Sequence, residues 1–167
     1  MKKLLILVVS LLVFATSCLK DGANSPSSSS SYEGSITVTD LDTGEVTYSE
    51  DKASIVVSIP QSENKIMDIM FKGVKFDKMM PLRLNIKVAD IPFNTTVSED
   101  DTAVNFVFDA ANIIPTVGDV PYKKYKIDRI WGCLGKQVDV MFEMWSKSKR
   151  VHFSTVKGDS GSSNTGE

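Results

Sequence analysis

The sequence predicts an all-β fold in which an antiparallel meander closes into a barrel of about eight strands, with a β-sandwich as the alternative. Apolar and polar residues alternate along the chain, most cleanly at 82–88, where Leu82, Leu84, Ile86 and Val88 share one face. No comparable stretch has the apolar spacing of a helix. A long meander leaves exposed edge strands unless the sheet closes into a barrel or divides into the two sheets of a sandwich. Only a barrel removes the edges completely, so we favour a barrel over a sandwich.

Composition and charge favour a single globular domain and argue against a nucleic-acid-binding protein. The chain has 167 residues, of which 42% are apolar and 24% are charged, as in a single globular domain. Nineteen basic and 21 acidic residues give a formal net charge of −2. No basic stripe is present that could replace the counterions of nucleic-acid phosphates. The sequence therefore argues against a nucleic-acid partner.

Residues 1–17 predict a secretory signal peptide. Lys2 and Lys3 form a short positive stretch, an apolar run covers residues 4–15, and small residues precede Cys18. The apolar run is too short to cross about 30 Å of hydrocarbon, which distinguishes it from a membrane-spanning helix. We therefore expect the mature chain to begin at Cys18.

The position of Cys18 after small residues resembles the lipobox of bacterial lipoproteins. In that family the cysteine thiol becomes thioether-linked to diacylglycerol and ends as the first residue. The resemblance implies lipidation of Cys18, and two or more acyl chains would make the membrane anchor stable. The polar, Ser-rich composition predicts a flexible tether over residues 18–31. Residues 157–167 are similar in composition and predict a disordered tail.

Residues 32–156, between tether and tail, predict the barrel domain. Its alternating runs lie at 36–39, 46–48, 55–59, 67–76, 82–88, 104–108, 125–131, 138–144 and 151–155. The turn-forming residues Asp42, Thr43 and Gly44 separate the first two runs. The apolar parity changes at Lys72-Gly73 inside the fourth run, which predicts a β-bulge that restores the core face.

The same residues carry a family resemblance. The chain is similar to the calycin-like β-barrel lipoproteins of Bacteroidales in its lipobox-like Cys18, in 32–38, in the strand at 67–76, and in 80–86 with Ile91-Pro92. The resemblance covers residues 32–156 and implies an eight-stranded, lipocalin-like barrel. It also implies a lipid anchor in the outer membrane. The Gly-x-Trp signature of true lipocalins is missing.

Noncatalytic binding is the function that the sequence favours. A small apolar or amphipathic molecule would bind inside the barrel or at its mouth, where methionine and aromatic side chains form an adaptable pocket. The candidate ligand-binding residues are Met79, Met80, Phe106, Phe108, Trp131 and Phe142. In the alternative, side chains fill the barrel, and the protein docks onto a cell-envelope partner through its outer surface.

The sequence predicts no enzymatic activity, no cofactor and no metal site. His152 is the only histidine, and its neighbours Val151 and Phe153 place it on the opposite face of their strand. Cys133 is the sole thiol once Cys18 is acylated, and its neighbours in sequence include neither a histidine nor a basic cluster that would activate it. No catalytic residues are therefore assigned.

One modification signal remains. Asp101-Thr102-Ala103 resembles the short Asp-Ser/Thr-aliphatic motif that Bacteroidetes use for O-glycosylation of exported proteins. The resemblance implies a glycan on Thr102. Asp21 is the only acidic residue close behind Cys18, so the sequence leaves open whether the anchored domain faces the periplasm or the cell exterior.

Overall fold

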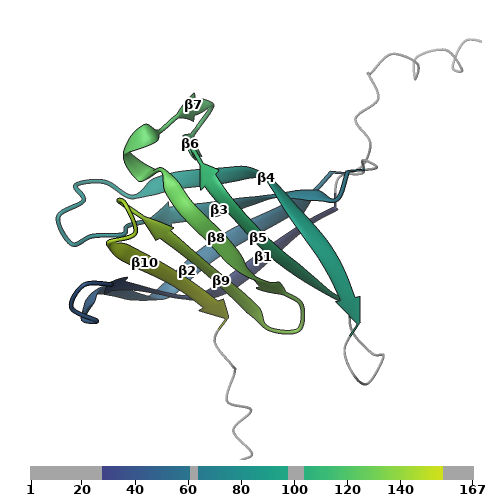
Figure 1. Cartoon of the computed structure of the whole chain (residues 1–167), viewed down its shortest axis with the longest axis horizontal. Helices are drawn as coiled ribbons and strands as arrows, with labels where there is room; N and C mark the ends of the chain where they lie inside the picture. Colours follow the sequence, from purple (N-terminus) through teal and green to yellow (C-terminus); the bar gives the residue numbers. More distant parts are fainter. Residues whose placement is uncertain (1–27, 61–63, 98–103, 156–167) are drawn as a thin grey trace, which may run out of the picture.

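The computed structural model describes residues 28–60, 64–97 and 104–155 (Figure 1). Strands dominate the described residues, together with one 3₁₀ turn, η2, at Lys123–Tyr125. The strands are β1 (Ser28–Asp40), β2 (Val46–Ile59), β3 (Ile66–Val74), β4 (Leu84–Val97), β5 (Val104–Ile113), β6 (Thr116–Val117), β7 (Val120–Pro121), β8 (Ile127–Leu134), β9 (Val138–Met144) and β10 (Lys149–Thr155).

Eight of these strands close into an antiparallel barrel. In chain order they are β1, β2, β3, β4, β5, β8, β9 and β10, and each pairs with the next. The last strand pairs back onto the first, from Gly34 opposite Thr155 to Asp40 opposite Lys149. The predicted meander barrel is therefore confirmed, and the alternative sandwich is wrong because the ring of pairings is continuous.

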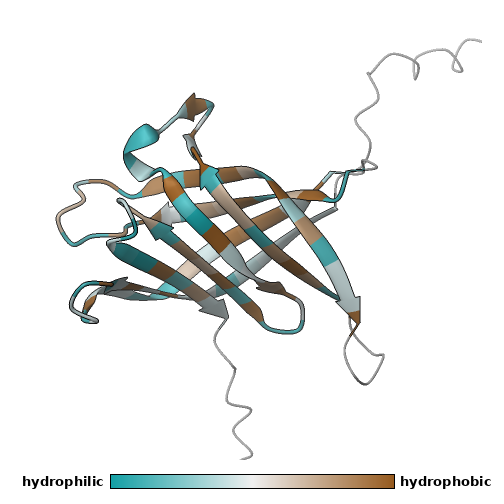
Figure 2. Cartoon of the chain, viewed as in Figure 1, coloured by the Kyte–Doolittle hydropathy of each residue, from teal (hydrophilic) through white to brown (hydrophobic). Residues whose placement is uncertain are grey.

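The inside of the barrel is apolar. Hydrophobic and hydrophilic residues alternate along the strands (Figure 2), and the inward set is buried, with no buried polar or charged residue among the described ones. Phe71, Phe76 and Phe142 meet edge to face, with ring centroids 5.2 to 6.4 Å apart. Aromatic pairs of this geometry add to the hydrophobic free energy of their burial.

The strand directions give the barrel two distinct ends. β1 begins and β10 ends at one of them, which we call the chain end. The connections β1–β2, β3–β4, β5–β8 and β9–β10 lie at the other, which we call the distal end. There the buried ring of Tyr125, from η2, packs against the ring of Phe76 with centroids 6.0 Å apart. These two side chains lie over the interior Phe142 and occupy the distal mouth.

The connection from β5 to β8 contains structure that the sequence pattern missed. The strand expected at 125–131 begins at Ile127, because Tyr125 belongs to η2. Upstream, β6 pairs with β4, with Val117 opposite Ile86, and β7 folds back onto β6. Strands of two residues are too short to show a periodicity.

The predicted β-bulge in β3 is confirmed. The register between β3 and β4 shifts between Phe71 and Val74, and both of these side chains remain buried. Gly73 has a φ of +56°, a conformation in which a side chain would be strained. Its N–H donates to Oδ1 of Asn85 at 2.8 Å, and its carbonyl accepts from Arg83 at 2.8 Å. The two contacts hold the bulge against the loop that leads into β4.

The N-terminal boundary of the barrel needs correction. The sequence assigned residues 18–31 to the tether and began the domain at 32, but β1 begins at Ser28. Residues 28–31 pair with β2 from Ile59 back to Val56. Their serine side chains are exposed, so main-chain pairing and not apolar burial holds this part of β1. A serine run carries no hydropathy signal of such pairing.

The turn between β1 and β2 depends on Asp40. Its Oδ1 accepts the N–H groups of Asp42 and Thr43, both at 3.0 Å, and its Oδ2 accepts from Nζ of Lys149 at 2.5 Å. The hydrogen bond from Lys149, followed by that from Thr43, lowers the pKa of Asp40 from 3.8 to about 2. The charged carboxylate therefore links the hairpin to β10 at the last pair of the closing register.

The lowered pKa of Asp40 predicts a pH-dependent contribution to stability. A carboxyl whose pKa is lower in the folded state stabilises the fold above its unfolded pKa, and this effect disappears as pH falls from about 4 through about 2. Asp40→Asn should therefore lower the melting temperature at pH 6 and have a much smaller effect near pH 2. Asp42→Asn is the control, because Asp42 forms no ion pair with a described residue. An equal loss for Asp40→Asn at both pH values would contradict the assignment.

Because the aromatic rings pack against one another, we expect removal of one ring to lower the free energy of unfolding strongly. Phe142→Ala should lower the free energy of unfolding by about 3 to 5 kcal/mol, because it removes buried area and leaves a cavity. Met79, whose side chain is 87% exposed, provides the control, and Met79→Ala should change stability by less than about 0.5 kcal/mol. Urea unfolding of both variants measures the difference. Equal effects would mean that the interior is not close-packed.

Candidate functional site

The residues predicted to bind a ligand lie in different environments and do not form one pocket. Phe142 and Phe108 face the interior and are buried. Phe106 is half-buried near the chain end, where its ring meets that of Phe93 with centroids 5.3 Å apart. Trp131 lies on the outer surface of β8, on the other side of the barrel wall from Phe142. A single small ligand cannot contact both.

Met79 and Met80, in the β3–β4 loop, also differ in their environment. Met80 is buried, and its sulfur accepts the N–H of Phe76 at 3.1 Å, so it helps to seat the ring that fills the distal mouth. Met79 projects into solvent. Its own N–H donates to Oδ1 of Asp77 at 2.7 Å, which fixes the backbone of the turn. Only Met80 therefore belongs to the interior.

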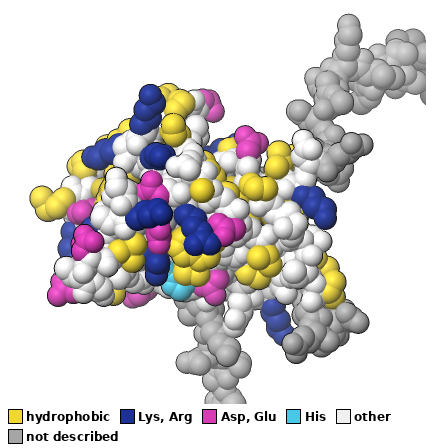
Figure 3. All heavy atoms as spheres, viewed as in Figure 1, with side chains coloured by type: hydrophobic (Ala, Val, Ile, Leu, Met, Phe, Trp, Pro, Cys, Tyr) yellow, Lys and Arg dark blue, Asp and Glu magenta, His cyan; other side chains and the backbone are white. Residues whose placement is uncertain are grey.

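A hollow of about 580 Å³ lies on the outer wall of the barrel, over β5, β8, β9 and β10. Its lining residues are Val107, Phe108, Asp109, Trp131, Gly132, Cys133, Asp139, Met141 and His152. Figure 3 shows this wall, marked by the single histidine, with basic and acidic side chains around hydrophobic ones. We call this feature the wall hollow. An apolar floor with charged groups at the rim suits an amphipathic molecule.

Trp131 is the largest side chain of the wall hollow, and two arginines hold it in place. The guanidinium carbons of Arg129 and Arg150 lie 4.9 and 5.5 Å from the ring centroid. Each arginine is in turn paired with a carboxylate, Arg129 with Asp109 at 2.5 Å and Arg150 with Glu143 at 2.8 Å. The strand register places both arginines on one side of Trp131 and the row of Cys133 and Asp139 on the other. The indole therefore has a fixed position beside the hollow.

The titratable groups of the wall hollow form no catalytic pair with Cys133. Nε2 of His152 lies 2.5 Å from Oδ1 of Asp139, and the imidazole is on the outer face, as predicted from its neighbours. Burial, and then the charge of Asp139, raises the pKa of the Cys133 thiol, which disfavours the reactive thiolate at neutral pH. Within 28–60, 64–97 and 104–155, no three His, Cys, Asp or Glu side chains gather as metal ligands.

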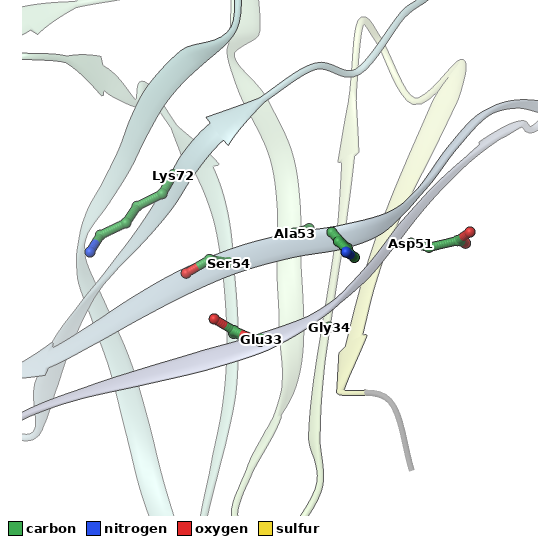
Figure 4. Close-up of a pocket in the computed structure, with 7 residues that line it drawn as sticks. Glu33, Gly34, Asp51, Ala53, Ser54 and Lys72 are labelled. Atoms are coloured by element: carbon green, nitrogen blue, oxygen red, sulfur yellow. The ribbon is translucent and has the colours of Figure 1, made fainter. Parts of the chain in front are cut away.

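A second hollow, of about 590 Å³, lies on the outer side of β1, β2 and β3. Figure 4 shows Glu33, Ser54 and Lys72 on these three neighbouring strands, and the register places Ser54 opposite both of the others. Gly34 lines its base, and a Cβ there would lie 2.1 Å from the carbonyl oxygen of Ser154, so glycine allows β1 to approach β10 closely. The exposed charges of both signs make this hollow a poor site for an apolar ligand.

Two of the predicted modification sites cannot be placed. Cys18 and Thr102 lie outside the described residues, as do the signal peptide and the tail. Among the residues that the structure describes, no helix has the length and apolar character needed to span a bilayer.

Comparisons of the chain with protein-family models, with curated proteins and with solved structures found no match.

Proposed function

We propose that this protein is an exported, noncatalytic lipoprotein, anchored to the outer membrane through an acylated Cys18, that docks onto an envelope partner through the outside of a filled barrel. The signal-peptide pattern and the position of Cys18 support the anchor. The all-β barrel is compatible with the resemblance to calycin-like lipoproteins. The raised pKa of the buried Cys133 thiol supports a noncatalytic role, because it disfavours the nucleophilic thiolate.

The observation that carries this proposal is the packing of the interior. Eight-stranded barrels are just wide enough for side chains to fill them, and small ligands bind inside only where side chains leave room. Here Phe71 and Phe142 occupy the centre with ring centroids 5.2 Å apart, and Phe76 and Tyr125 occupy the distal mouth. A filled interior leaves the outer surface as the part of the barrel that meets other molecules.

The wall hollow supports a second candidate, the binding of a small amphipathic molecule on the outside of the barrel. Its lining combines Trp131 and Met141 with the carboxylates of Asp109 and Asp139. This candidate is still the noncatalytic ligand binding that the sequence favours, but the binding site lies on the outer wall of the barrel and not in its interior. Of the aromatic residues that the sequence predicts to bind a ligand, Trp131 and Phe108 line the hollow, and of these two only Trp131 faces outward, because Phe108 is buried.

Acylation of Cys18 predicts a defined biochemical result. In cells fed an alkyne fatty acid, the wild-type chain should acquire the label and sediment with membranes. Cys18→Ala should lose the label, because the thioether needs the thiol, whereas Cys133→Ala should keep it. In-gel fluorescence after coupling to a dye measures the label. An unlabelled wild-type protein, or a labelled Cys18→Ala variant, would contradict the anchor.

The filled interior can be tested with benzene as an apolar probe. Methyl NMR signals of Ile130 and Val140, which face inward, should not shift in the wild type. In Phe142→Ala the same signals should shift saturably, because benzene enters a dry cavity of that size. Shifts confined to Met141 and lost in Trp131→Ala would assign binding to the wall hollow. Saturable shifts of the inward methyl groups in the wild type would overturn the filled barrel.

A further inference from the structure

Exposed apolar side chains gather on two adjacent connections at the distal end. Met79 and Leu82, in the β3–β4 loop, are 87% and 68% exposed, and Ile114 and Val120, in the β5–β8 connection, are 43% and 66% exposed. Together they are half of the exposed large hydrophobic residues in the described chain. We call these four residues the distal patch. Exposed apolar side chains concentrated at one end of a barrel are suited to contact with another surface.

The two connections lie side by side. β6 pairs with the start of β4, with Val117 opposite Ile86, directly after the loop that contains Leu82. On the interior side, Phe76 of the loop packs against Tyr125 of η2. The elements that carry the distal patch are therefore fixed to one another by a strand pair and by an aromatic contact.

Lysines surround the distal patch. Lys75 and Lys78 belong to the β3–β4 loop, and Lys123 and Lys124 form the start of η2. None of the four forms an ion pair with a described residue. The acidic groups of the same two connections are Asp77 and Asp119, so these four lysines alone outnumber them by two. The remaining basic residues of the two connections, Arg83 and Lys126, pair with Glu50 and Asp128. Figure 3 shows basic and hydrophobic side chains together in the region of β6 and β7, with an acidic side chain beside them.

We propose that the distal patch binds the surface of an anionic lipid bilayer. Aliphatic side chains on loop tips can enter the boundary between headgroups and acyl chains, and lysines keep their ammonium groups at the phosphates while their stems follow the apolar side chains. The local excess of positive charge is opposite to the formal net charge of −2 of the whole chain. Complementary charge at this end favours an anionic surface over a neutral one.

The aromatic residues of the distal end support this assignment. Tyr122 and Trp145 are partly buried against the core, and Nε1 of Trp145 donates to the carbonyl of Lys124 at 2.9 Å. That hydrogen bond fixes the backbone between the lysine pair and the barrel. The basic side chains therefore extend from a rigid base, which reduces the ordering needed when they meet a membrane. This inference goes beyond the proposed function, because it requires neither Cys18 nor its acyl chains.

Vesicle flotation tests the proposal with a chain of residues 19–167, which keeps every described residue and all of the barrel core and lacks the acylated cysteine. It should float with vesicles of phosphatidylcholine and phosphatidylglycerol and remain behind with phosphatidylcholine alone. Lys123→Glu combined with Lys124→Glu should weaken the partition by about tenfold or more. Met79→Ser combined with Leu82→Ser should weaken it as well, including at about 1 M salt, where charge attraction is screened.

A matched charge reversal at the chain end provides the control. Lys65 and Lys136 are exposed and lie in or beside chain-end turns, so Lys65→Glu combined with Lys136→Glu should leave the partition unchanged. Circular dichroism of each variant establishes that the barrel is folded. Equal partition onto neutral and anionic vesicles, or an equal loss in the chain-end control, would overturn the proposal. Because Cys18 is absent from the chain tested, this result is independent of the anchor.

Discussion

The pairing of β10 with β1 is the constraint on which the rest of the structure depends. Once these strands pair, each strand of the barrel has a fixed inner face. The width of the interior is then set by the number of strands, which is eight. The apolar side chains that point inward then pack against one another in that space, and each contact contributes dispersion energy. Phe71, Phe76 and Phe142 pack against one another in the interior, and this packing is the basis of the proposal that the barrel is filled.

Much of this fold could be predicted, because closed antiparallel sheets impose a period of two on the sequence. The parity change at Lys72-Gly73 corresponds to the register shift in β3. The run at 82–88 corresponds to β4 only from Leu84 onward, because Leu82, expected on the core face, precedes the strand and is 68% exposed. Two features could not be predicted from hydropathy. Residues 28–31 pair through the main chain with exposed serine side chains, and β6 and β7 are too short to show any period.

The candidate site was less predictable, because hydropathy identifies apolar residues but not the side of the wall on which they lie. Phe142 and Trp131 are both large and aromatic, yet one fills the interior and the other packs outside against two arginines. The register shift between Ile127 and Arg129 changes the parity of β8, so that Ile130 faces inward and Trp131 outward. The charged residues around Trp131 come from four strands, with Asp109 in β5, Arg129 in β8, Glu143 in β9 and Arg150 in β10, and sequence spacing alone does not bring them together.

The topology also separates the two ends of the barrel in a way that bears on function. An even number of antiparallel staves returns the chain to the end where it began, so β1 begins and β10 ends at the chain end. A lipid anchor at Cys18 would therefore pull on the chain end, while the distal patch and the lysines of the same two connections lie at the opposite end. The distal patch is thus better placed to meet a second surface than the membrane that holds the anchor.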